Sequence, residues 1–115
     1  MNALLEREAS VEVSNPLGIE GIEFVEYTTP RPQALGQVLE LMGFRPTARH
    51  RSREVLLYRQ GAMNVIINAH ASQGGHSVAL PEPPAIAAIA LRVRDAAAAH
   101  QRALELGAWD VPVQV

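Results

Sequence analysis

The fold of this chain is decided by residues 50–68, which read HRSREVLLYRQGAMNVIIN. Val55 and Leu57 point to one side and Leu56 to the other, which is the alternation of a pleated strand. Gly61 can adopt the positive φ that a tight turn needs, and a second β-branched run follows it. The stretch therefore predicts a β-hairpin with two apolar faces. Because an isolated hairpin is only marginally stable in water, we expect the flanking segments to cover it.

Length and composition limit the classes of protein that this chain can belong to. It has 115 residues, 48% of them hydrophobic, which is enough for one compact core. A formal net charge of −2 gives no general attraction to nucleic acid or to an anionic membrane. Without cysteine there is no thiolate site or disulfide, and no run resembles a signal peptide or a membrane span. We therefore expect a soluble cytoplasmic protein that binds neither nucleic acid nor membrane.

The segment ahead of the hairpin predicts a strand followed by a helix. Residues 19–28 read as the strand, Thr29 is placed to cap the helix with a proline in its first turn, and Gly43 is placed to end it. Residues 44–49 then read as extended. The helix carries one apolar stripe at helical spacing, formed by Leu35, Val38, Leu39 and Met42. We expect this stripe, including Met42, to belong to the core, and Trp109 likewise.

The segment after the hairpin repeats the start of this pattern. Residues 85–93 predict a strand, Asp95 caps a helix that runs to Leu106 before Gly107, and residues 109–115 predict a further strand. Leu39 and Leu104 occupy equivalent places 65 residues apart, which indicates an internal repeat. We predict an α+β fold made of a polar lead-in, a complete βαβββ module, a Gly- and Pro-rich connector and an incomplete second βαβ copy, at residues 1–14, 15–69, 70–84 and 85–115.

This plan resembles the vicinal oxygen chelate superfamily, which includes glyoxalases, bleomycin-resistance proteins and dioxygenases. Several sequence segments resemble the N-terminal domain of the 4-hydroxyphenylpyruvate dioxygenase family: NPLGIEGIEFVEYT at 15–28, MGF at 42–44, RHRS at 49–52, VLLYRQGAMNVIIN at 55–68 and ALELGAWDVPV at 103–113. That family uses non-haem Fe(II) to convert 4-hydroxyphenylpyruvate to homogentisate in tyrosine catabolism, and its chains are much longer. The resemblance implies a non-catalytic assembly domain, inactive alone, that packs against its own C-terminal catalytic domain.

The resemblance also implies where an iron ligand would stand in this chain. The family holds Fe(II) with two histidines and one carboxylate in its C-terminal domain. Glu23 occupies the position equivalent to the first ligand, Ala88 the second, and the third falls near Ile67. Alanine and isoleucine cannot ligate a metal. We therefore expect no catalytic, cofactor-binding or metal-binding residue here, and no iron bound to this chain.

Other polar residues have simpler interpretations. Four histidines are present, but no pair has the i, i+4 spacing of a helical metal site; they are His50, His70, His76 and His100. Glu23 and Glu26 point to opposite faces of a strand, so they cannot form an acid–base pair, and we expect an arginine on a neighbouring strand to pair with Glu23. Five arginines could hold an anionic ligand, but guarding a strand edge is the simpler role; they are Arg45, Arg49, Arg51, Arg53 and Arg59.

Two alternatives to the dioxygenase domain stay open at this point. One is a stand-alone dimeric binding or resistance protein of the same superfamily, and the other is a metal-dependent lyase of the glyoxalase type. A coding sequence that continued past Val115 into strands with two histidines and a glutamate would favour the dioxygenase, and a stop codon there would favour the stand-alone protein. Because the second copy lacks two strands, we expect a homo-oligomer that covers the exposed strand edges.

Overall fold

The computed structural model describes residues 13–69, 72–73, 76–77 and 83–111. These residues form two compact units. The larger unit lies within residues 21–92, and the smaller unit combines residues 13–20 with 93–111. No helix among the described residues is long and apolar enough to cross a bilayer.

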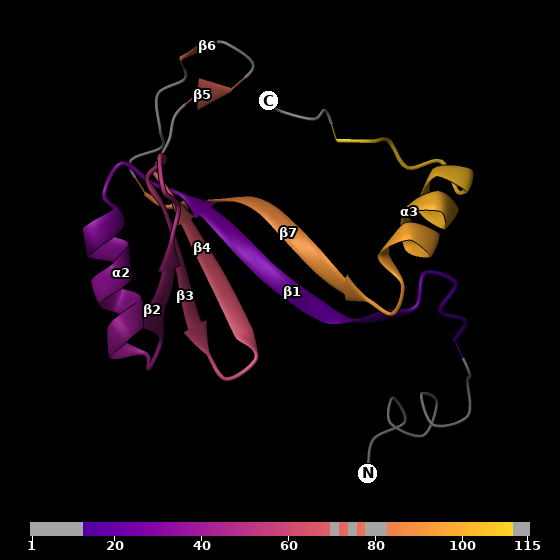
Figure 1. The fold of residues 1–115 in the computed structure, drawn as a ribbon, viewed down its shortest axis with the longest axis horizontal. Helices are drawn as coiled ribbons and strands as arrows, with labels where there is room; N and C mark the ends of the chain where they lie inside the picture. The colour runs from indigo at the N-terminus through magenta and orange to yellow at the C-terminus, as the bar shows by residue number, and fades with distance from the viewer. Residues whose placement is uncertain (1–12, 70–71, 74–75, 78–82, 112–115) are drawn as a thin grey trace, which may run out of the picture. The chain divides into compact units, whose positions relative to one another are not determined.

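The central element is a mixed five-stranded sheet with the strand order β2-β3-β4-β1-β7 (Figure 1). Its strands are β1 (Ile19–Thr28), β2 (Arg45–Arg49), β3 (Val55–Gln60), β4 (Met63–Asn68) and β7 (Ala85–Val93). β1 runs parallel to β4, with Val25 opposite Val65, whereas β3 pairs antiparallel with both of its neighbours. The helix α2 (Pro32–Leu41) connects β1 to β2. This arrangement confirms the predicted α+β fold and the strand–helix–strand–strand–strand order of the first copy.

The predicted hairpin is formed by β3 and β4. Gly61 has a φ of 59° at the turn, in the left-handed region that favours glycine. The pair Leu56 and Ile67 and the pair Tyr58 and Val65 lie opposite each other across the hairpin. One face of the hairpin lies in the core, where four buried side chains meet, with Leu35, Leu56 and Val65 packed against them; the four are Leu39, Phe44, Tyr58 and Ile67. The helix α2 (Pro32–Leu41) thus packs against one face of the hairpin.

The helix α2 begins later than the sequence predicts. Thr29 does not cap it: the Thr29 hydroxyl accepts the N–H of Arg31 at 3.0 Å and shapes the turn before the helix. Arg31 holds the N-cap position with φ −124° and ψ 70°, and its side chain makes no cap hydrogen bond. The reason is the second proline, because a residue before proline is disfavoured in the helical region. Pro32, rather than Pro30, is therefore the first-turn proline.

The buried face of α2 is narrower than the predicted stripe. Leu39 is buried and Leu35 is half-buried, but Val38 is 51% exposed and Met42 is 60% exposed, so the expectation of a core Met42 is wrong. The cause is Gly36, which is buried so close to the Tyr58 hydroxyl that a Cβ at this position would overlap it. The helix approaches β3 through this glycine, and the stripe is turned partly away from the sheet.

The smaller unit contains the helix α3 (Ala96–Glu105), which has the ends that the sequence predicts. The Asp95 carboxylate accepts the N–H of Ala98 at 3.1 Å, and Gly107 follows the helix with a φ of 104°. The predicted last strand is not formed by residues 109–111, and 112–115 lie outside the described residues. Trp109 is 94% exposed, so the expectation of a core residue is wrong. Asp110 contacts His100 of α3, which keeps this segment beside its own helix rather than in a ladder.

The connector contains a short element that the sequence analysis did not predict. β5 (Ser72–Gln73) pairs antiparallel with β6 (His76–Ser77) in a separate two-stranded sheet. The described residues contain the first strand and the helix of the predicted second copy, which are β7 and α3. The incomplete second copy stays a prediction.

Candidate functional site

Glu23 lies on β1 and forms an ion pair with Arg92 of the neighbouring strand β7. The Arg92 Nε donates to Glu23 Oε1 at 2.9 Å, and the side chains are 39% and 44% exposed, respectively. The Arg92 hydrogen bond and charge hold the pKa of the Glu23 carboxyl below its usual range, with a smaller contribution from the charge of Arg59. The predicted arginine partner on a neighbouring strand is confirmed.

Further hydrogen bonds fix the surroundings of this pair. The Arg92 Nη2 also donates to the backbone carbonyl of Ala62 at 3.4 Å, and the Asn64 side chain donates to the backbone carbonyl of Glu23 at 3.0 Å. The carboxylate at the first-ligand position is therefore engaged by a cation, and a metal ion would have to displace that cation to bind there.

The other two ligand-equivalent positions provide no donor atom. Ala88 lies on β7 and is exposed, whereas Ile67 lies on β4 and is fully buried in the core. An Fe(II) ion of the dioxygenase type needs imidazole and carboxylate ligands. An ion-paired carboxylate, a methyl group and a buried isoleucine do not fit it. Within the part of the chain that the structure describes, no three His, Asp or Glu side chains form a group that could hold a metal.

Two histidines and Glu26 make local contacts instead. The His50 Nδ1 accepts the N–H groups of Ser52 and Arg53 at 3.1 Å each, which shapes the loop before β3. His100 contacts Asp110, and the Glu26 carboxylate accepts the side-chain amide of Asn68 at 3.2 Å. His70 and the side chain of His76 lie outside the described residues.

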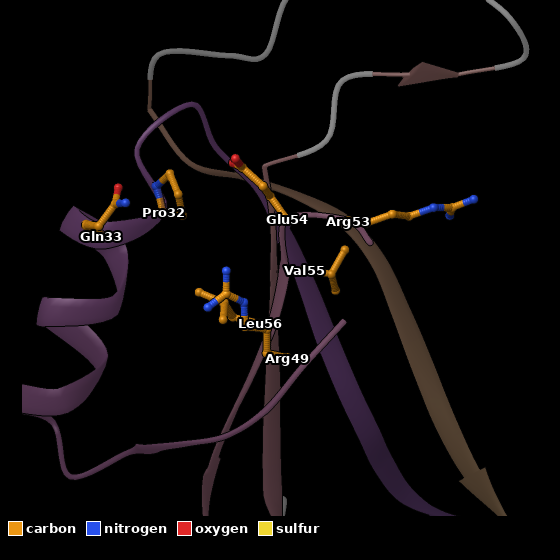
Figure 2. A pocket seen from close by; sticks show the side chains of 7 residues that line it. All are labelled: Pro32, Gln33, Arg49, Arg53, Glu54, Val55 and Leu56. Atoms are coloured by element: carbon orange, nitrogen blue, oxygen red, sulfur yellow. The ribbon is translucent and has the colours of Figure 1, made fainter. Parts of the chain in front are cut away.

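The five predicted arginines do not form one cluster. Arg45 and Arg59 lie opposite each other in the β2–β3 ladder, and Arg51 is exposed in the following loop. Arg49 and Arg53 instead line a pocket of about 220 Å³ at the other end of the ladder (Figure 2). The other residues that line this pocket are Pro32, Gln33, Glu54, Val55 and Leu56.

Sequence reasoning missed the members of this pocket other than the two arginines. Gln33 and Glu54 are separated by a helix and a strand, and no spacing in the sequence indicates that they share a cavity. The only available signal was a pair of charged residues, Arg53 and Glu54, directly before an apolar strand.

Comparison with known proteins gives one consistent family. Residues 13–115 match the family described as Hydroxyphenylpyruvate dioxygenase, HPPD, N-terminal. The chain is 42% identical over 100 residues to 4-hydroxyphenylpyruvate dioxygenase of Pseudomonas sp. (strain P.J. 874), covering 87% of this chain and 28% of that protein. It is 40% identical over 86 residues to 3-dehydroshikimate dehydratase of Pseudomonas putida (strain KT2440), covering 73% of this chain and 14% of that protein.

A solved structure shares the fold. It is a xylose isomerase-like TIM barrel/4-hydroxyphenylpyruvate dioxygenase fusion protein, with a TM-score of 0.64 and 34% identity, and the match covers 90% of this chain and 18% of that chain. The chain therefore spans less than a third of the length of each of these relatives. From the family match and these identities, we conclude that the chain belongs to the hydroxyphenylpyruvate dioxygenase N-terminal domain family.

Proposed function

We propose that this chain is the non-catalytic N-terminal domain of a 4-hydroxyphenylpyruvate dioxygenase-like protein of tyrosine catabolism. The Fe(II) and the oxygenase chemistry of such a protein would belong to a separate catalytic domain, against which this domain packs. Relatives named 4-hydroxyphenylpyruvate dioxygenase support the assignment of the parent protein. The cytoplasmic location stays a prediction, and the absence of cysteine is consistent with it.

The observation that carries this proposal is the state of the three ligand-equivalent positions. Glu23 is held by Arg92, Ala88 has no donor atom, and Ile67 is fully buried among apolar side chains. A domain of this fold that had kept its metal site would present polar donors at these positions. Here the space is used for an interstrand ion pair and for packing, which favours a structural role.

The sheet edges support a role in assembly. All five residues of the edge strand β2 are exposed, and they include two arginines and a proline, which protect an edge against pairing. The other edge strand, β7, has one charged residue and three large apolar side chains that are each more than half exposed; these are Ile86, Ile89 and Leu91. The unprotected β7 edge is the surface that we expect to be covered, by the catalytic domain or by a second copy of this chain.

Oxygen uptake tests the proposed lack of activity. The 115-residue chain, supplied with Fe(II), ascorbate and 4-hydroxyphenylpyruvate, should consume oxygen no faster than the same mixture without protein. Uptake that saturates with 4-hydroxyphenylpyruvate and disappears on chelation would contradict the proposal. Such a result would favour a stand-alone metalloenzyme of this superfamily.

A further inference from the structure

We propose that the pocket between the start of α2 and the β2–β3 connection binds the zwitterion of a small apolar α-amino acid. Pro32 and Gln33 line it from α2, Arg49 from the end of β2, and Leu56 from β3 (Figure 2). Glu54 lines it from the loop that precedes β3. None of these residues belongs to the ligand-equivalent positions or to the β7 edge, so the site is independent of the proposed assembly role.

The pocket holds two opposite charges that do not neutralise each other. Within the described residues, neither Arg49 nor Glu54 forms a side-chain hydrogen bond or ion pair. Figure 2 shows the side chains of Arg49 and Glu54 extending toward the side on which α2 lies, whereas the Arg53 guanidinium extends the other way. On the side of α2 the pocket thus presents the Arg49 cation and the Glu54 anion, held apart, whereas Arg53, which also lines the pocket, turns its guanidinium away (Figure 2). An amino acid zwitterion carries a carboxylate and an ammonium group that complement this pair.

The size and the apolar walls define the rest of the ligand. A cavity of about 220 Å³ is smaller than a pocket for a drug-sized molecule, which limits the ligand to a few heavy atoms beyond the charged groups. Pro32 and Leu56 are half-buried and offer apolar surface, and the Gln33 amide adds a polar contact. A side chain of the size of leucine suits these walls. Inorganic phosphate suits the site poorly, because Glu54 would repel a dianion.

The assignment is tested by titrating the intact 115-residue chain with three related probes and monitoring each titration by ¹H–¹⁵N NMR. The probes are L-leucine, isocaproate, which lacks the ammonium group, and isopentylamine, which lacks the carboxylate. We expect L-leucine to shift the amide signals of Gln33 and of residues 49–56 in a saturable way. We expect its Kd to be about fivefold lower than that of either probe, the upper range for one exposed ion pair.

Three variants show whether the two charges act as proposed. Arg49→Gln should weaken binding of L-leucine to the level of isopentylamine, and Glu54→Gln should weaken it to the level of isocaproate. Arg45→Gln is the matched control, because Arg45 is exposed on the same strand and lies outside the pocket. A dispersed NMR spectrum confirms that each variant is folded.

Several outcomes would overturn the proposal. If L-leucine gives no saturable shift up to its solubility limit, the pocket is not an amino acid site. If isocaproate or inorganic phosphate binds as tightly as L-leucine, the site is a general anion site. An equal loss of binding in Arg45→Gln and Arg49→Gln would mean that only net charge matters.

Discussion

At the scale of single residues, the ion pair between Glu23 and Arg92 makes a prediction about acid stability. The pKa of the folded-state carboxyl is lowered, so the pair stabilises the fold above the unfolded-state pKa of glutamate, and that stabilisation is lost as pH falls through the folded-state pKa. Arg92→Gln should raise the pKa of Glu23 toward its usual value. Arg59→Gln should raise it less, because Arg59 acts only through its charge. Carboxyl NMR titration measures both shifts, with Arg45→Gln as the control. Equal shifts in all three variants would contradict the assignment of Arg92 as the main cause.

Gly36 allows the prediction of a packing defect. In Gly36→Ala, the added methyl group would overlap the hydroxyl of buried Tyr58. Overpacking costs about 1–3 kcal/mol, and so close an overlap belongs in the upper part of that range. The gain in helix propensity returns about 1 kcal/mol, so we expect a net loss of about 1–2 kcal/mol. Denaturant unfolding measures it, and Gly21→Ala is the control because nothing lies within 4 Å of its added Cβ. The second substitution Tyr58→Phe should recover part of the loss. A neutral Gly36→Ala would show that α2 does not pack on β3 through this glycine.

At the scale of elements, the end of α2 shows how a glycine connects a helix to a strand. Gly43 has a φ of 103°, its N–H bonds the carbonyl of Glu40, and the N–H of Phe44 bonds the carbonyl of Leu39, which is a Schellman motif. The Gln60 side chain of β3 donates to the carbonyl of Met42 at 3.1 Å, directly beside this turn. The hydrogen bond from Gln60 to Met42 thus joins the C-terminal end of α2 to the hairpin.

This geometry predicts unequal costs for two glycine substitutions. Both Gly43→Ala and Gly61→Ala force alanine into the left-handed region, which should lower the free energy of unfolding by about 1–2 kcal/mol each. Gly43→Ala should cost about 1 kcal/mol more, because its Cβ would displace Gln60 and break the hydrogen bond to Met42. The Cβ at Gly61 would meet nothing within 4 Å. Unfolding free energies of the two variants give the comparison, and equal losses would contradict the role of Gln60.

The elements also show what the sequence could predict and where it could not. The bounds of β1 and β7 agree with the predicted strands, because local alternation and the adjacent turns determine them. The start of α2 was misplaced because two prolines stand two residues apart and only the second begins the helix. Its buried face was misjudged because the contact of Gly36 with Tyr58 is a tertiary one. The kind of partner that Glu23 has, an arginine on a neighbouring strand, was predictable because opposite charges on adjacent strands attract each other. The pocket was not predictable, because three separate segments form it.

At the scale of the whole molecule, the unprotected edge of β7 predicts self-association. Multi-angle light scattering at micromolar concentration should give a dimer or a larger species, because exposed strand edges and apolar side chains are costly in water. Ile89→Lys places a charge at a β7 position that is 56% exposed, and it should shift the chain toward a monomer. Ala48→Lys on the protected edge strand β2 is the control and should not. A compact monomer of the unsubstituted chain would contradict the expected oligomer.

The central claim is that this domain does not hold the catalytic iron, and calorimetric titration with Co(II), an air-stable substitute for Fe(II), tests it most directly. We predict no one-to-one binding at neutral pH, because Glu23 is engaged by Arg92 and neither Ala88 nor Ile67 provides a donor. Weak binding that survives Glu23→Gln would come from surface histidines and leaves the claim intact. Tight one-to-one binding that is lost in Glu23→Gln would contradict it and would identify the chain as a metalloenzyme in its own right.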